Sequence, residues 1–334
     1  MRGEPVLQGL VAGFDNDDMS DPIAFFRAFQ ALLQGRGITG VLTSGMACVE
    51  YGLQQNTKDT DWIVAPADID RLVALFVELE RGVSGGNWRV SYRGLFGAPL
   101  ESEYLAGGWT SHLAVFEGPE AAERHLDFFG RPPRVGDGWP TDAVAGIASR
   151  DVVARMKKTD RPKDWPLVNA LAIQAFYEGD PRAVLHLRDP EILREAWRQF
   201  PGASRNLAIH ERPLLSVVDS LDDLRLERLL LVEEMLWKCI NRERYFVYQH
   251  AWKGFYRSWQ QDRIGDWPTA EPFAQQHRRV CEAVREHGLP PAPLATAAAR
   301  QAVYDRGLER AAGLVAATPE EITLVAMPLD MILV

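Results

Sequence analysis

The most restrictive stretch of the sequence is residues 43–64, where two aspartates follow a short turn and a short helix. The apolar, β-branched run ITGVLTS predicts a buried strand. A Ser44-Gly45 turn, a short helix over MACVEYGL and a second strand over DTDWIVA follow it. On a strand, side chains two residues apart point to the same face, so Asp59 and Asp61 lie with their Cβ atoms roughly 6–7 Å apart. We therefore expect two carboxylates side by side on this strand.

Paired carboxylates suit the binding of a divalent cation. Two carboxylates on one face repel each other unless a cation lies between them, and Mg²⁺ or Mn²⁺ prefers such oxygen ligands. In two-metal nucleotidyl transfer a third carboxylate is needed beside the first two, and the backbone N–H groups of a turn before a helix can bind phosphate oxygens. The alternative is that Asp59 and Asp61 are ordinary surface residues, which is the more common meaning of so short a motif.

The rest of the chain predicts an α+β fold with two parts. Helical spacing is clear over residues 21–33 and 66–80, and strand-like runs follow in WRVSYRG, ESEYLAG, SHLAVFE and RHLDFF. From Asp142 onward the pattern is mainly helical, with the longest helix expected over residues 224–259. We predict a small mixed sheet with flanking helices in residues 1–140, followed by a mainly helical domain in residues 141–334.

Composition excludes several classes of protein. The net charge of −9 argues against a protein that coats nucleic acid through electrostatics. The three cysteines, Cys48, Cys239 and Cys281, are too widely spaced for a disulfide framework or a zinc motif, which favours a reducing compartment. The N-terminus has no signal-peptide pattern, and no apolar run approaches the ~20 residues needed to cross a bilayer. We expect a cytoplasmic protein without a membrane partner.

Two separate motifs carry a family resemblance. Residues 43–64 resemble the signature of the nucleotidyltransferase (polymerase-β-like) superfamily, in which a strand, a Gly-Gly or Gly-Ser turn and a short helix precede Thr-x-Asp-x-Asp. The run SRDVVARMKKTDRPKDWPLVNAL resembles an element of the branch that contains the abortive-infection-type toxins and related bacterial proteins. The matching residues of this second run are Asp151, Lys157 or Lys158, Arg161, Lys163 and Asp164. Together the two motifs cover residues 38–170.

The resemblance implies further site residues. It implies a third catalytic and metal-binding carboxylate on a later strand, for which we select Asp127 between apolar neighbours. The rivals are Glu101, Glu103 and Glu117. The resemblance also implies nucleotide contacts. These are expected at Ser44, Gly45 and Thr57 near the turn, and at Lys157, Lys158, Arg161, Lys163 and Asp164 in the second element. For the basic residues, the alternative is a solvated helix end.

The predicted activity is a magnesium- or manganese-dependent nucleotidyltransferase. It would move an NMP group from an NTP to an acceptor hydroxyl and release pyrophosphate. The acceptor is left open among a tRNA end, a protein and a small molecule. His112 is a candidate substrate contact, although a lone histidine at a strand start is more often structural. The alternatives are a catalytically inert binding or antitoxin-like module, whose helical C-terminal half meets a protein partner, and a hydrolase that uses the same metal site.

Overall fold

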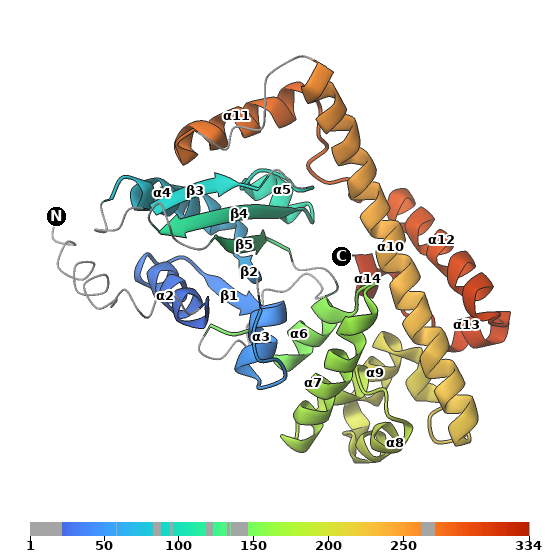
Figure 1. The fold of residues 1–334 in the computed structure, drawn as a ribbon. Helices are drawn as coiled ribbons and strands as arrows, with labels where there is room; N and C mark the ends of the chain where they lie inside the picture. The colour runs from blue at the N-terminus through green and yellow to red at the C-terminus, as the bar shows by residue number, and fades with distance from the viewer. Residues whose placement is uncertain are drawn as a thin grey trace. The chain divides into compact units, whose positions relative to one another are not determined.

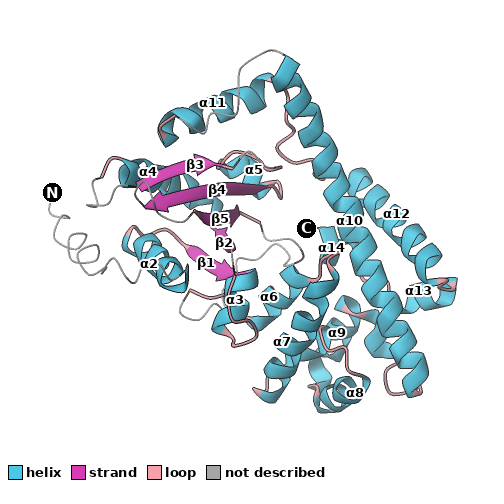
Figure 2. Ribbon diagram, in the orientation of Figure 1, coloured by secondary structure: helices cyan, strands magenta, loops and turns pink. Residues whose placement is uncertain are grey.

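The computed structural model describes residues 22–57, 59–82, 88–93, 96–117, 123–131, 134, 146–261 and 271–333. The fold is α+β, with a five-stranded mixed sheet, flanking helices and a long helical C-terminal part, as predicted (Figures 1 and 2). Contacts divide the chain into two compact units. The first comprises Met1–Arg131, Ala143–Ile147 and Gln249–Ala292, and the second comprises Pro132–Asp142, Ala148–Tyr248 and Pro293–Val334. Each unit is described by itself below.

The sheet of the first unit has the strand order β1-β2-β5-β4-β3. Its strands are β1 (Gly40–Thr43), β2 (Asp59–Val64), β3 (Trp88–Tyr92), β4 (Thr110–Glu117) and β5 (Arg124–Phe129). Only the β2–β5 pair is parallel; the other three pairs are antiparallel. This register places the Cα of Asp61 opposite that of Asp127, on two strands that are adjacent in the sheet.

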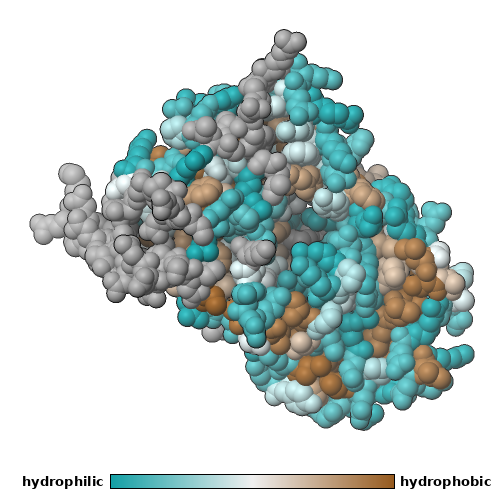
Figure 3. Space-filling model, in the orientation of Figure 1, coloured by the Kyte–Doolittle hydropathy of each residue, from teal (hydrophilic) through white to brown (hydrophobic). Residues whose placement is uncertain are grey.

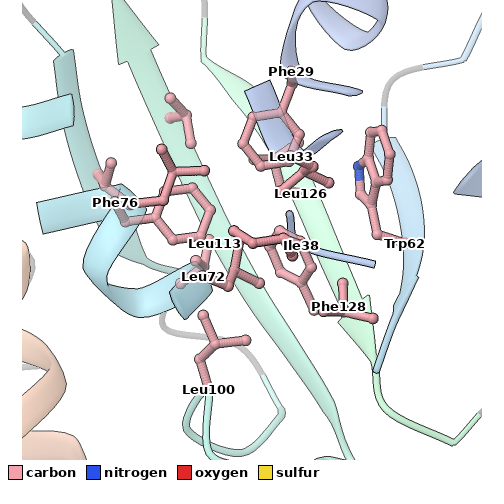
Figure 4. Packing of buried hydrophobic residues seen from close by; sticks show 14 of the residues in the cluster. Phe29, Leu33, Ile38, Trp62, Leu72, Phe76, Leu100, Leu113, Leu126 and Phe128 are labelled. Atoms are coloured by element: carbon pink, nitrogen blue, oxygen red, sulfur yellow. The ribbon is translucent and has the colours of Figure 1, made fainter. Parts of the chain in front are cut away.

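One face of the sheet forms the hydrophobic core with helices α2 (Pro22–Gly35) and α4 (Ile69–Glu80). Phe29 of α2 and Phe76 of α4 stack with ring centroids 5.8 Å apart, and both rings contact Phe128 of β5 (Figure 4). Trp62 is fully buried in the same cluster. Because alternate residues of a strand face opposite sides, the neighbours of Trp62 and Phe128 in sequence face away from this core.

Helix α11 (Phe273–Glu286) packs on the sheet of the first unit, although it follows long after it in sequence. The ring of Phe273 contacts Phe76 and Tyr92, and the Gln276 amide bonds the backbone of edge strand β3. A division of the chain at residue 140 places α11 with the C-terminal helices, whereas its contacts place it with the sheet. The predicted boundary itself lies outside the described residues.

The second unit is helical. Its helices are α6 (Arg150–Lys157), α7 (Trp165–Tyr177), α8 (Pro190–Gln199), α9 (Arg205–Glu211), the first part of α10 (Asp223–Gln261), α12 (Ala297–Val315), α13 (Pro319–Val325) and α14 (Leu329–Leu333). Among the described helices, none is long and apolar enough to cross a membrane. On the face drawn in Figure 3, hydrophilic residues predominate and hydrophobic ones form small groups.

Two local predictions need correction or restriction. The run ESEYLAG was predicted as a strand, but the structure forms the helix α5 (Ser102–Ala106) there. The reason is that its residues are mostly good helix formers and their backbone bonds are local: the Leu105 N–H donates to the Glu101 carbonyl and the Gly107 N–H to the Glu103 carbonyl. The helix expected from Asp142 begins at Arg150, where the Ser149 hydroxyl accepts a hydrogen bond from the Val152 N–H; residues 142–145 lie outside the described part of the chain.

Candidate active site

The three predicted carboxylates lie on one face of the sheet, opposite the face that α2 and α4 cover. Asp61 of β2 and Asp127 of β5 are in register on adjacent parallel strands, and Asp59 lies two residues before Asp61. The three aspartates share this face because side chains alternate along a strand. Their sequence neighbours Thr60, Trp62 and Leu126 point to the other face and are fully buried. The Asp59 side chain is 48% exposed and that of Asp127 is 14% exposed. The site is therefore open to solvent at its Asp59 end.

Two histidines and one arginine hold these carboxylates. His112 of β4 lies opposite Asp127 in register, with Nδ1 at 2.7 Å from Oδ1 of Asp127. His125 of β5 lies with Nδ1 at 2.5 Å from Oδ1 of Asp59. The Nη1 atom of Arg93 is 3.6 Å from Oδ1 of Asp59 and 3.5 Å from Oδ1 of Asp127. One guanidinium thus spans two carboxylates, and an imidazole fixes the orientation of each.

Ser44 and Gly45, which were predicted as a turn, are the first residues of α3 (Ser44–Glu50), and this helix start packs against the segment that leads into β2. Ser44 has a φ of +54°, a left-handed conformation that glycine adopts more readily than serine. A Cβ atom on Gly45 would lie 2.7 Å from Oγ1 of Thr57, and this hydroxyl donates a hydrogen bond of 2.9 Å to the Asp59 carbonyl. The predicted phosphate-binding residues Ser44, Gly45 and Thr57 are therefore brought together beside Asp59.

A small, mainly apolar pocket adjoins the histidine side of the site. Arg93 and His112 line it together with residues of β3, of the segment before β4, of α10 and of α11: Tyr92, Gly97, Ala98, Pro99, Phe255, Val280 and Val284. A Cβ atom on Gly97 would lie 2.8 Å from the His112 ring, so glycine allows the chain to pass close to this histidine. Asp127 and this pocket are thus connected through His112.

The second motif of the sequence is ion-paired within the helical unit. The Asp164 carboxylate is buried and contacts Lys157 Nζ at 3.5 Å and Arg161 Nε at 2.8 Å, while the Thr159 hydroxyl donates to it at 2.6 Å. Lys163 is exposed. The chemical consequence is that Asp164 neutralises two of the predicted phosphate-binding cations.

Lys158 is also buried, against different partners. Its Nζ donates a hydrogen bond of 3.0 Å to the Leu185 carbonyl and lies 4.8 Å from the centre of the Trp237 ring. Burial lowers the pKa of Lys158 to about 7, against the opposing effect of Glu233. All of these basic residues belong to the second compact unit, whereas the three aspartates belong to the first.

Asp151, the first residue of that motif, holds a further pair of side chains. Its carboxylate contacts His186 Nε2 at 2.8 Å and Arg155 Nε at 3.0 Å, and Arg155 reaches Glu211 at 2.8 Å. Although burial alone would raise it, the hydrogen bond from His186 and the charge and hydrogen bond of Arg155 hold the pKa of Asp151 well below its usual range. The same burial lowers the pKa of His186 to about 3, so this histidine is neutral at pH 7.

Two residues at the site were not predicted from the sequence: Arg93 and His125. A signal for His125 exists, because it lies two residues before Asp127 on the same strand and must share its face. No comparable signal marks Arg93, which follows β3 and reaches Asp59 and Asp127 only through the strand order of the sheet.

The donor atoms of the site suit a hard cation, since three carboxylates supply oxygen ligands. Within the described residues, however, no group of three or more His, Cys, Asp or Glu side chains has a metal-holding arrangement. The Oδ1 atoms of Asp59 and Asp127 instead contact imidazole nitrogens and Arg93. The residues fit Mg²⁺ or Mn²⁺ by their chemistry, provided that the guanidinium gives way.

Comparison of this chain with protein-family models, with curated proteins and with solved structures gave no match. What the protein does is therefore inferred from the residues on this face of the sheet and from the resemblance of the two sequence motifs. The residues that carry most weight are Asp61 and Asp127, because their alignment on neighbouring strands depends on the fold and not on the motif alone.

Proposed function

We propose that the protein is a magnesium- or manganese-dependent nucleotidyltransferase that transfers an NMP group from an NTP to an acceptor hydroxyl. The observation that carries this proposal is the register of Asp61 and Asp127 on adjacent parallel strands, with Asp59 on the same face. Three carboxylates on one face of two adjacent strands are of the kind that metal-assisted nucleotidyl transfer uses, and this shared face supports the proposal. The helix start at Ser44 and Gly45, which packs against Thr57 beside Asp59, offers backbone N–H groups to the triphosphate.

In this proposal each residue has a defined task. Asp59, Asp61 and Asp127 would hold the metal, which would supply Lewis-acid stabilisation of charge on the triphosphate. Asp127, oriented by His112, accepts the proton of the acceptor hydroxyl. The hydroxyl oxygen then forms a bond to the α-phosphorus, the bond from that phosphorus to the bridging oxygen breaks, and pyrophosphate leaves. His125 fixes the rotamer of Asp59.

The basic residues of the second motif differ in how accessible they are to a substrate. Arg161 is 54% exposed and Lys163 is exposed, so among the basic residues of the second motif these two have accessible head groups, whereas Lys157 and Lys158 are buried. A tRNA end, a protein hydroxyl and a small molecule stay equal candidates for the acceptor. The helical C-terminal part offers a surface for a protein partner.

Calorimetry with ATP, GTP, CTP and UTP, with and without Mg²⁺, tests the proposal. We expect metal-dependent binding of at least one nucleotide, at least tenfold weaker in Asp61→Asn and Asp127→Asn. Asp70→Asn is the matched control, since Asp70 is an exposed acid of α4 in the same unit. Nucleotide binding that needs no metal and survives in Asp61→Asn, or no binding at all, would refute it.

A second candidate is a catalytically inert binding module. The contacts of Arg93 favour it, because this guanidinium already neutralises Asp59 and Asp127. Pyrophosphate release separates the two candidates: a transferase releases pyrophosphate from its NTP and labels an acceptor, whereas an inert module does neither. Release of free phosphate in place of pyrophosphate would indicate a hydrolase at the same site.

A further inference from the structure

The side chain of Arg93, directly after β3, reaches two carboxylates of the candidate site. Its backbone N–H donates to the His112 carbonyl at 3.0 Å, which extends the β3–β4 ladder by one residue. Its side chain is 18% exposed and lies within 3.6 Å of carboxylates on two other strands, β2 and β5. Arg89, within β3, is exposed and lies 5.7 Å from the centre of the Phe116 ring. Arg93 is therefore fixed at the backbone and directed into the acidic cluster.

The charges of the cluster explain this position. Carboxylates of Asp59, Asp61 and Asp127 on one face repel one another, and partial burial of Asp127 strengthens that repulsion by reducing solvent screening. A guanidinium that reaches two of the three carboxylates relieves it. A divalent cation that bridges the carboxylates would do the same and would need the same oxygen atoms.

We infer that Arg93 is the resident counter-cation of this site and that its guanidinium and a divalent metal compete for Asp59 and Asp127. This inference rests on the proposed function for the existence of the metal site and assigns its regulation. Metal binding displaces a positive charge from the carboxylates, and the guanidinium so released is free to meet an anion. Phosphate oxygens are favourable partners for guanidinium, so the triphosphate of an incoming nucleotide is the anion that best suits it. The site thus keeps its charge balanced before the metal arrives.

Direct metal titration tests the competition. We expect Arg93→Gln to bind Mn²⁺ on the order of tenfold more tightly than the natural chain, because a competing charge is removed. The matched control is Arg89→Gln, which removes an exposed arginine from β3, directly before Arg93, and should leave the affinity unchanged. Arg93→Lys keeps the charge and should retain most of the competition. Calorimetry and the paramagnetic signal of free Mn²⁺ both measure the affinity without any turnover.

Thermal unfolding in a chelator supplies the second measurement. Without metal, Arg93→Gln should unfold several degrees lower than Arg89→Gln, since the carboxylates lose their counter-cation, and Mg²⁺ should recover the difference. If Arg93→Gln binds metal equally or more weakly than the natural chain, the competition is refuted and the metal site stands. If neither the natural chain nor Arg93→Gln binds metal, the proposed function fails and the competition fails with it.

Discussion

At the scale of single residues, Gly45 of the candidate site has no room for a Cβ atom. A methyl group there would lie 2.7 Å from Thr57 Oγ1, too close for unshifted atoms. We predict that Gly45→Ala lowers the free energy of unfolding by about 1–3 kcal/mol, because Thr57 must move and give up its hydrogen bond to Asp59. Urea denaturation measures the change.

Two further variants make this prediction specific. Gly35→Ala, at a helix end where a Cβ meets no atom within 4 Å, should change stability by less than about 1 kcal/mol. Adding Thr57→Ala to Gly45→Ala removes the clashing oxygen, so the double variant should be more stable than the sum of the two single changes predicts. Strict additivity would show that the contact has no energetic importance.

Lys158 makes stability depend on pH. Burial lowers its pKa in the folded chain to about 7, whereas the unfolded chain retains the ordinary value near 10.5. Between these values the unfolded state binds more protons, so stability rises with pH, by at most about 1.4 kcal/mol per pH unit. Below pH 7 the cost of burying the charged ammonium is fully present.

Denaturant titrations from pH 7 to pH 10 measure this dependence. Below pH 9, where the buried Cys281 and Arg134 contribute little, the slope should be much smaller in Lys158→Met, which cannot titrate, and should persist in Lys163→Met, which removes an exposed lysine instead. Equal slopes in all three chains would assign the pH dependence to other groups.

Some residues of the site could be predicted from the sequence and others could not, for a physical reason. Asp59 and Asp61 share a face because of the alternation of a single strand, which is a local property. The choice of Asp127 needed the resemblance, since its alignment with Asp61 depends on the pairing of β2 with β5. Arg93 depends on the order of four strands, and no local pattern contains that information.

At the scale of elements, a buried ion pair links the segment after α9 to α10. Arg212 and Glu233 form two hydrogen bonds, of 2.8 Å and 2.7 Å, with both side chains about 5% exposed or less. The other end of the guanidinium donates to the carbonyls of Val184 and Leu187. One arginine thus satisfies acceptors from two other segments of the helical unit, residues 184–187 and α10.

We predict that Arg212→Met lowers the free energy of unfolding by about 3–5 kcal/mol, because it leaves Glu233 buried and unpaired. The double variant Arg212→Met, Glu233→Met should recover part of this loss. Arg182→Ala, which removes an exposed pair with Asp180, should cost less than about 1 kcal/mol. A loss for Arg212→Met as small as that for Arg182→Ala would contradict the assignment.

Periodicity predicted the long and strongly patterned elements, whereas it gave the wrong structure for the short run ESEYLAG. The helix predicted over residues 224–259 is α10 (Asp223–Gln261), and the strand RHLDFF is β5, because long or strongly patterned runs leave few alternatives. ESEYLAG is too short to show a period, so helix propensity and the local hydrogen bonds from Leu105 and Gly107 decide that it is a helix.

At the scale of the whole molecule, the sheet depends on residues far along the chain. Phe273 and Val280 of α11 belong to the same buried cluster as Phe76 and Phe128. A fragment of residues 1–148 lacks these side chains and should therefore be largely unfolded. Adding residues 249–292 through a flexible linker should restore cooperative unfolding, as measured by near-ultraviolet circular dichroism and thermal denaturation.

The natural control for this experiment is the same linked fragment with Phe273→Asp. It should remain unfolded, because the charge cannot be buried against Phe76 and Tyr92. A stable fold of residues 1–148 alone would show that the sheet does not need α11 in order to fold. Sequence did not reveal this dependence, since an amphipathic helix shows which face it buries but not against what.

The backbone of each outer strand of the sheet forms hydrogen bonds with a segment that is synthesised later. The Leu42 N–H of β1 bonds the Gly146 carbonyl, and the Gln276 amide bonds Tyr92 N–H and the Val90 carbonyl of β3. During synthesis, the five strands therefore leave the ribosome before either outer strand can be covered. Such an unfinished chain offers two unpaired strand edges until Gly146 is made, and the edge of β3 until α11 is made, so we expect the interval between the translation of β5 and that of α11 to be when these edges can pair with other nascent chains.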